Sequence, residues 1–172
     1  IELMVFRAWM ENLPHVRKVF RGLGKSIASV HGVKAIGAMI SSPEETKRES
    51  GLQTLVQNID FAHSFGAQNL TIHAWDPLET KLVLTGSVEA LEQVLDHATR
   101  KNVAISVEIT PSASLEPYQM ARLLDKTLDN GFKFTVDSEF AGQYDSIQKL
   151  LGFSHRVNNL HVRDYDGRWL TE

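Results

Sequence analysis

The sequence of 172 residues contains no cysteine, so it forms neither disulfide bonds nor thiolate–metal sites. Any bound metal ion must therefore be held by nitrogen and oxygen ligands. The sequence also has no apolar run near the roughly 18 residues that a membrane span needs. Its first residues have no basic region and no cleavage signature of a secretory signal. We therefore expect a cytoplasmic protein that does not enter membranes.

Clustered positive charge is absent as well. The net charge is −3, and basic residues occur only in short groups such as Arg17-Lys18 and Arg100-Lys101, which fall on helical patterns. Surfaces that bind nucleic acids normally need a patch of lysine and arginine. The charge pattern therefore argues against a nucleic-acid partner and favours a small-molecule ligand.

What the sequence does contain is a regular alternation of strand-like and helix-like segments. Proline and capping residues favour helix starts at Asn12-Leu13-Pro14, at Ser42-Pro43, near Ser87 and near Pro117. A further helix is predicted near residues 144–151. Strands are predicted at residues 1–5, 27–30, 69–72, 103–107, 132–136 and 157–162.

Six strands separated by helices, without a linker or a change in composition, indicate parallel βαβ units in one α/β domain. An open doubly wound sheet and a (β/α)8 barrel share this pattern. The first strand-to-helix turn has no G-x-G-x-x-G motif, so nothing supports dinucleotide binding. Because a strand begins at Ile1, we expect the chain to be part of a longer protein.

Ionisable side chains stand at or near the ends of five consecutive predicted strands. These residues are His31, His73, Glu108, Asp137 and His161. In a barrel all parallel strands point their C-terminal ends to one rim, which is the catalytic face. Two carboxylates with imidazoles suit a divalent cation, and Mn²⁺, Zn²⁺, Co²⁺ and Mg²⁺ all remain open. The sequence therefore predicts a metal site at this rim, with Glu108, Asp137 and His161 at its centre.

In the order and spacing of these motifs the chain resembles the sugar phosphate isomerase/epimerase family of xylose isomerase-like TIM barrels. The resemblance covers nearly the whole chain. It is carried by Val30-His31-Gly32, by the helix from Ser42 to Gly66 that leads to the strand ending at His73, and by Val107-Glu108, Val136-Asp137 and Leu160-His161-Val162-Arg163-Asp164.

The resemblance implies a truncated (β/α)8 TIM barrel, in which residues 1–172 form one partial domain with barrel strands two to seven. A complete barrel of this kind usually needs about 250 residues. The resemblance also implies that Glu108, Asp137 and His161 are metal ligands and that a fourth ligand, a glutamate, belongs to a missing eighth strand. Many members carry a histidine where this sequence has Phe140, which puts one substrate contact in doubt.

The function implied is divalent-metal-dependent isomerisation or epimerisation of a small sugar, sugar phosphate or polyol. Glu108, or the absent glutamate, would remove the proton next to the substrate carbonyl, and an enediolate would follow. His31, His73, Trp75 and Arg168 are expected to contact the substrate. On this interpretation the 172 residues by themselves should be inactive, and the exposed edges of the incomplete barrel would favour association into homo-oligomers.

Other interpretations of the same residues stay open. The same proton abstraction begins the dehydration of a polyol ketone. A phosphodiesterase of the endonuclease IV type would need more metal ligands and a basic face, and a sugar-binding barrel without catalysis would fit Phe140. In structural terms, Glu108 and Asp137 could form a buried ion pair or a loop cap, His31 and His73 could be core histidines, and Trp75 could simply pack in the core.

Overall fold

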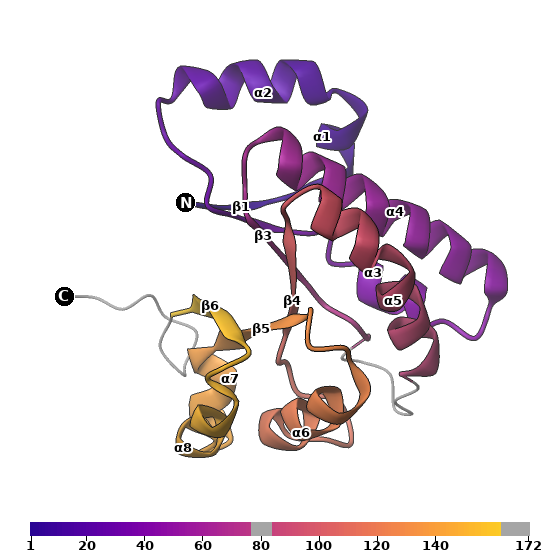
Figure 1. Ribbon diagram of the computed structural model, residues 1–172, viewed down its shortest axis with the longest axis vertical. Helices are drawn as coiled ribbons and strands as arrows, with labels where there is room; N and C mark the ends of the chain where they lie inside the picture. The colour runs from indigo at the N-terminus through magenta and orange to yellow at the C-terminus, as the bar shows by residue number, and fades with distance from the viewer. Residues whose placement is uncertain (77–83, 163–172) are drawn as a thin grey trace.

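The computed structural model describes residues 1–76 and 84–162, and in them six parallel strands form a single sheet (Figure 1). The strands follow one another in chain order across the sheet, which curves into part of a barrel. They are β1 (Glu2–Met4), β2 (Ser29–His31), β3 (Asn69–Ile72), β4 (Ala104–Glu108), β5 (Lys133–Asp137) and β6 (Val157–His161). All six predicted strands are confirmed, and most bounds differ from the prediction by one or two residues.

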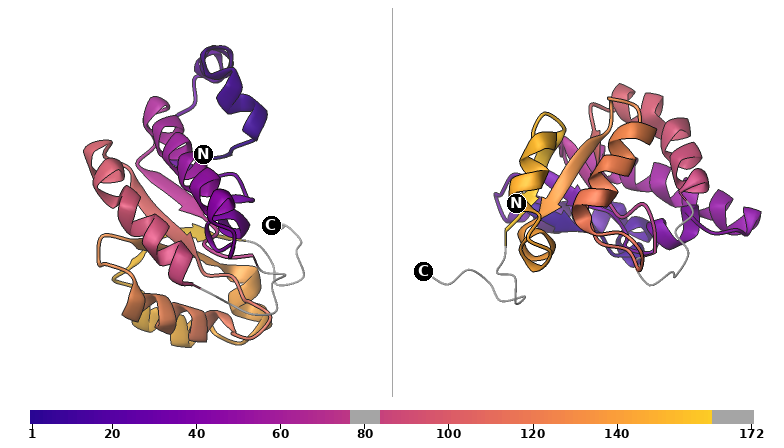
Figure 2. Two further views of the ribbon diagram at one scale, coloured as in Figure 1. Left: turned by 90° about the vertical axis from the view of Figure 1, so that its right-hand side faces the viewer. Right: turned by 90° about the horizontal axis from the view of Figure 1, so that it is seen from below.

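The helices lie along the outer side of the curved sheet, with α4 and α5 side by side and α6 to α8 around its C-terminal half (Figures 1 and 2). Each strand is joined to the next through helical segments, as parallel pairing requires. The helical segments are α1 (Arg7–Glu11), α2 (Leu13–Gly22), α3 (Ile36–Ile40), α4 (Glu45–Ser64), α5 (Thr85–Arg100), α6 (Pro117–Thr127), α7 (Ser138–Gln143), α8 (Ile147–Leu150) and the 3₁₀ turn η1 (Leu151–Phe153).

Successive side chains along a strand point to opposite faces of the sheet, and here the two faces differ in chemistry. The outer face is apolar and packs under the helices, with Val30, Leu70, Ile105 and Phe134 all fully buried. The inner face is polar. Its lower part is closed by side-chain hydrogen bonds, which join Thr71 to Thr135 (3.0 Å), Asn159 to Thr71 (3.0 Å), and Asn69 to Ser29 (3.0 Å).

Barrel interiors are commonly filled by branched apolar side chains. In this chain, hydroxyl and amide groups take that place, and they donate and accept hydrogen bonds among themselves. The inner face is therefore polar from the bottom of the strands up to the rim.

Several predicted helix boundaries are wrong. Ser42 is not the first capping residue of α4, since the helix begins at Glu45 and the Ser42 hydroxyl accepts from the backbone N–H of Glu44 (3.2 Å). Ser87 does not cap α5 either, because it lies inside the helix and its hydroxyl donates to the carbonyl of Ala74. The start of α6 at Pro117 is confirmed.

Two further differences come from tertiary packing. The helix predicted at residues 144–151 is shorter than expected, since only α8 and the first residue of η1 fall in that range. Asp145, at a φ of +47°, separates α8 from α7, which ends before the predicted segment. The short helix α3 was not predicted. It packs on the segment after β3, where a Cβ added to Gly37 would lie 2.5 Å from the Trp75 carbonyl oxygen. Only glycine permits that approach.

Two other features bear on the expected surroundings of the protein. None of the helices in the described part of the chain is both long and apolar enough to span a membrane. On the last strand and just after it, Leu160 and Val162 are 60% and 56% exposed. The expected association through the sheet edges stays a prediction.

Candidate metal centre

The inner rim of the sheet brings together the five ionisable residues predicted from the strand ends. Glu108 lies at their centre. The Nε2 atoms of His31 and His73 donate to its Oε2 at 3.1 and 2.9 Å, and His161 Nδ1 donates to its Oε1 at 3.1 Å. Asp137 is next to this group, with its Oδ2 4.0 Å from His161 Nδ1. Of these residues, Asp137 and His161 are partners in the register of β5 and β6. Glu108 is paired with Thr135, one step further along the sheet, so the cluster forms where staggered parallel strands bring their C-terminal ends to one rim.

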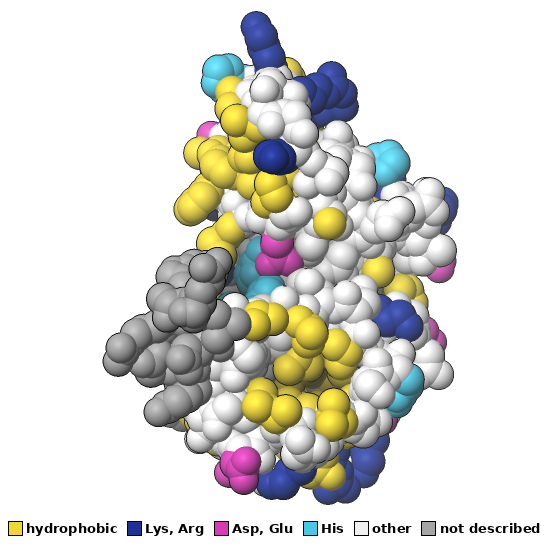
Figure 3. All heavy atoms as spheres, turned by 90° about the vertical axis from the view of Figure 1, so that its left-hand side faces the viewer, with side chains coloured by type: hydrophobic (Ala, Val, Ile, Leu, Met, Phe, Trp, Pro, Cys, Tyr) yellow, Lys and Arg dark blue, Asp and Glu magenta, His cyan; other side chains and the backbone are white. Residues whose placement is uncertain are grey.

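The side of the molecule on which β6 and the N-terminus lie gives a view of this region. Acidic and histidine side chains come to the surface together there, in a hollow between the N-terminal helices and the C-terminal half (Figure 3). The cluster is therefore sheltered but not sealed within the described residues. Burial is greatest for Glu108 and Asp137, which are 3% and 1% exposed.

Two sets of three residues have ligand atoms close enough to surround one cation. The first is Glu108, Asp137 and His161, and the second is His31, His73 and Glu108; within each set the ligand atoms lie within 4.8 Å of one another. Ligands around a metal at about 2.1 Å are separated by up to about 4.2 Å, so small side-chain movements would complete either set. A set of nitrogen and carboxylate ligands suits Zn²⁺, Mn²⁺ or Co²⁺ better than it suits an ion that prefers oxygen ligands alone.

The electrostatics of Glu108 favour a permanently ionised carboxylate. Burial by itself would raise its pKa, but hydrogen bonds from His161, His31 and His73, together with the charge of His73, outweigh burial. The pKa of Glu108 is therefore held well below its usual range. The hydrogen-bond donors around Glu108 stabilise its negative charge. A bound cation could replace those donors and stabilise the same charge.

Asp137 has a structural role as well as a place in the first set of three residues, which we call the first triad. Its Oδ1 accepts from the backbone N–H of Glu139 at 2.8 Å and so caps α7. Its Oδ2 is the oxygen that faces His161. The structural and the ligand interpretations of Asp137 are therefore compatible, because each uses a different oxygen.

Glu2 belongs to the cluster although it was not among the residues predicted from the sequence. Its Oε1 accepts from His161 Nε2 at 2.7 Å, and its Oε2 accepts from Asn159 at 2.8 Å and Ser29 at 2.6 Å. Burial would raise the pKa of Glu2, but these hydrogen bonds and the charge of His161 lower it to about 2. A charged residue inside the first apolar strand was the signal that could have identified it.

The remaining predicted residues are placed differently. Trp75 is 1% exposed and belongs to the hydrophobic core, and its Nε1 has no hydrogen-bond partner among the described residues. Its burial fits the core-packing alternative, and a substrate contact stays a prediction. Phe140 lies in α7, three residues after Asp137. Arg168 lies outside the described residues.

The charged cluster predicts how stability changes with pH when a chelator is present. Burial lowers the pKa of His161, but hydrogen bonds and charge from Glu108 and Glu2 outweigh it and raise the pKa to about 10 from an ordinary 6.5. The contribution of His161 to the free energy of unfolding is thus complete below pH 6.5 and is lost as the pH rises through about 10. Stability from Glu108 and Glu2, whose folded pKa values are lowered from 4.5, is present above pH 4.5 and lost on acidification.

The free energy of unfolding should therefore be greatest between pH 4.5 and 6.5 and should fall by on the order of a few kcal/mol towards pH 10. Urea denaturation across this range measures it. The His161→Gln variant is the reference, because it lacks the alkaline decrease that His161 causes. Equal pH profiles for the two proteins above pH 6.5 would contradict the prediction.

Comparison with known proteins agrees with the fold. A sequence profile described as xylose isomerase-like TIM barrel matches residues 10–171. No curated protein sequence matches the chain. Among solved structures, D-allulose 3-epimerase from Methylomonas sp. in complex with D-allulose has a TM-score of 0.79 at 15% identity, over 96% of this chain and 61% of that one.

Two other solved structures are similar. The TTHB071 protein from Thermus thermophilus, soaked with ZnCl2, has a TM-score of 0.77 at 20% identity, over 98% of this chain and 69% of that one. The 3-keto-D-glucoside 4-epimerase YcjR from E. coli has a TM-score of 0.72 at 14% identity, over 93% and 67%. At such identities the likeness shows the fold. This chain spans 61 to 69% of the length of the three proteins.

Proposed function

The chain belongs to the xylose isomerase-like TIM barrel family, and on that basis we propose that it binds a divalent cation through Glu108, Asp137 and His161 and contributes to the isomerisation or epimerisation of a small sugar. The observation that carries the proposal is the meeting of three such side chains, from three consecutive strands, within 4.8 Å. Similar structures include proteins named as sugar epimerases, which supports this class of substrate.

A bound divalent ion would polarise the substrate carbonyl and make the adjacent C–H easier to deprotonate. Glu108 and Asp137 supply two negative charges at buried positions, which favours a cation over any neutral ligand. Asp137 offers Oδ2 while its other oxygen keeps α7 in place. The hydrogen bond from Glu139 N–H therefore restrains the Asp137 carboxylate before a cation or a substrate binds.

Proton transfer is the second role proposed for Glu108. The hydrogen bonds that keep it ionised also make it a weak base, because the donors stabilise the charged form. Substrate hydroxyls can compete for His31 and His73, whose Nε2 atoms both donate to Glu108 Oε2. Once these donors turn to the substrate, Glu108 regains basicity beside the C–H bond that it would break.

The test is solvent-deuterium exchange by the product of the complete reading frame that contains these residues. With Mn²⁺, Zn²⁺, Co²⁺ or Mg²⁺ supplied, ketoses incubated in D₂O should gain deuterium at the carbon next to the carbonyl and form the epimer or the isomer. Chelation should stop the exchange. Exchange followed by loss of water would support the dehydratase instead, and metal and sugar binding without any exchange would support a non-catalytic barrel.

The second set of three residues, His31, His73 and Glu108, favours one other candidate function. Two cations about 3.5–4 Å apart are typical of enzymes that cleave phosphodiesters, and His31, His73 and Glu108 could hold a second ion that shares Glu108 with the first. Metal content distinguishes the two candidates. One ion per chain supports the isomerase, whereas two ions together with hydrolysis of a phosphodiester would support the second candidate.

A further inference from the structure

Glu2 and His161 join the two strands at opposite ends of the sheet. Glu2 lies on β1 and His161 on β6, which are the first and last strands in the sheet order. Curvature of the sheet brings the two side chains within 2.7 Å, although 159 positions separate them in the sequence. The contact therefore ties the two edges of the sheet together beside Glu108 and Asp137.

Both oxygens of Glu2 are engaged. Oε1 accepts from His161 Nε2, whereas Oε2 accepts from Asn159 on the same strand as His161 and from Ser29 on β2. The carboxylate is thus fixed from both sides and cannot rotate away without losing hydrogen bonds. A fixed acceptor determines which ring nitrogen of His161 carries a proton.

The two nitrogens of His161 face different surroundings. Nε2 faces Glu2, and Nδ1 lies 3.1 Å from Glu108 Oε1 and 4.0 Å from Asp137 Oδ2. Without a cation both nitrogens donate to carboxylates, whereas a cation bound at Nδ1 would take the place of the Nδ1 proton and leave Nε2–H donating to Glu2. Histidines that bind metals usually donate their other N–H to a carboxylate or carbonyl in this way.

We infer that Glu2 is a positioning residue for the candidate cation site, which fixes His161 as the Nε2–H tautomer and so makes Nδ1 the nitrogen that binds the cation. The inference rests on the proposed cation site and deepens it. Glu2 does not enter the ligand set itself. It acts through His161, and its removal should weaken metal binding without changing which carboxylates bind.

Two measurements test the inference, both on the product of the complete reading frame. In the protein loaded with ¹¹³Cd²⁺, the ¹⁵N spectrum of His161 should show a proton on Nε2 and cadmium coupling on Nδ1. By calorimetry, Glu2→Ala should weaken Zn²⁺ binding about 10- to 100-fold, which is the usual effect of removing such a partner. In Glu2→Ala the cadmium coupling should be divided between the two nitrogens of His161.

The Asn159→Ala variant is the matched control, because it removes another hydrogen bond between Glu2 and β6 but leaves His161 Nε2 its acceptor. Its Zn²⁺ affinity should stay within about threefold of the wild type, since the lost hydrogen bond involves no atom of a proposed metal ligand. An equal loss in both variants would mean that Glu2 only holds β6 in place, and would overturn the inference.

Failure of the inference and failure of the proposed function give different results. Cadmium coupling on Nε2 in the wild type, or an unchanged affinity in Glu2→Ala, overturns the role of Glu2 but leaves the cation site standing. A wild-type protein that binds no divalent cation overturns the proposed function and the inference together. The spectrum of the wild type decides the tautomer even if Glu2→Ala does not fold.

Discussion

Replacing Asp137 with asparagine is expected to lower the affinity for divalent cations by at least about 100-fold while the protein stays folded. Loss of a partner one step removed from a metal already costs about 10- to 100-fold, and Asp137 is proposed as a direct ligand. The asparagine Oδ1 can still accept from Glu139 N–H, so the cap of α7 is kept. The substitution therefore removes the charge and keeps the cap, and calorimetric titration with Zn²⁺ or Mn²⁺ measures the result.

The chain offers a closely matched control for this experiment. Asp129 is exposed, and its Oδ1 accepts from the backbone N–H of Gly131 at 2.7 Å, which is the same two-residue contact that Asp137 makes with Glu139. Asp129→Asn should bind the cation as the wild type does. If Asp137→Asn also binds like the wild type, Asp137 is a cap for α7 and not a ligand.

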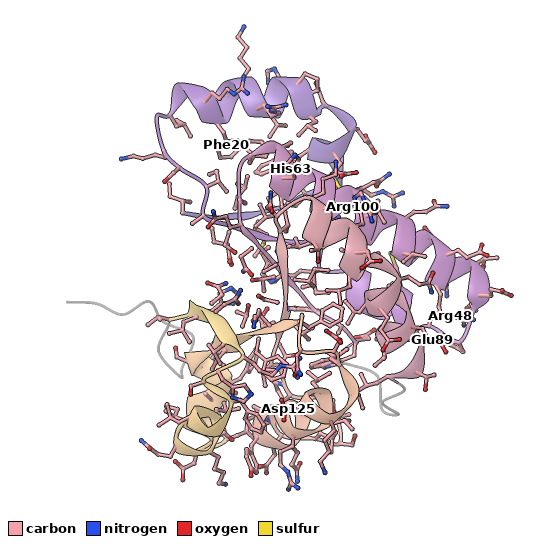
Figure 4. All side chains as sticks on the ribbon, in the orientation of Figure 1. Phe20, Arg48, His63, Glu89, Arg100 and Asp125 are labelled. Carbon is pink, nitrogen blue, oxygen red and sulfur yellow. The ribbon has the colours of Figure 1, made fainter. Side chains whose placement is uncertain are left out.

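The second large effect is expected at Arg156, which is 2% exposed and lies just before β6. Its guanidinium group donates to Asp125 Oδ1 at 3.1 Å and lies 4.8 Å from the centre of the Phe134 ring. Asp125 is on α6, in the lower part of Figure 4. The guanidinium group also donates to the backbone carbonyls of Asp125, Leu128, Asp129 and Phe132, at and beyond the end of α6.

Arg156→Leu should therefore lower the free energy of unfolding by about 3 kcal/mol or more, because it removes the donor of two buried and two partly buried carbonyls together with an ion pair. Urea denaturation measures the change. Arg122→Leu is the control, since Arg122 is an exposed arginine on α6 and should change stability by about 0.5 kcal/mol or less. A loss below about 1 kcal/mol for Arg156→Leu would contradict this account of Arg156.

The order of the elements could be predicted because the signals for strands and helices are local. Runs such as residues 69–72 and the proline at the start of α6 identify an element from a few neighbouring residues. The positions of His31, His73, Glu108, Asp137 and His161 at strand ends are equally local. With parallel strands, those positions imply a shared rim.

Other elements could not be predicted because their causes are distant in the sequence. The short helix α3 depends on the close approach of Gly37 to Trp75, and the hydroxyl of Ser87 bonds to Ala74 instead of capping α5. The polar interior of the sheet also depends on distant contacts. The pairing of Thr71 with Thr135 inside the sheet is visible only after folding, so polar positions in a strand did not disclose a polar barrel interior.

The sequence by itself therefore determined the parallel α/β architecture and the residues that could bind a cation, since both follow from local pattern and strand direction. Only the tertiary structure decided how those residues contact one another. It put Glu108 between three histidines, and it brought Glu2 to His161 across 159 positions of sequence. Curvature of the sheet makes these contacts, and no local pattern in the sequence encodes the curvature directly.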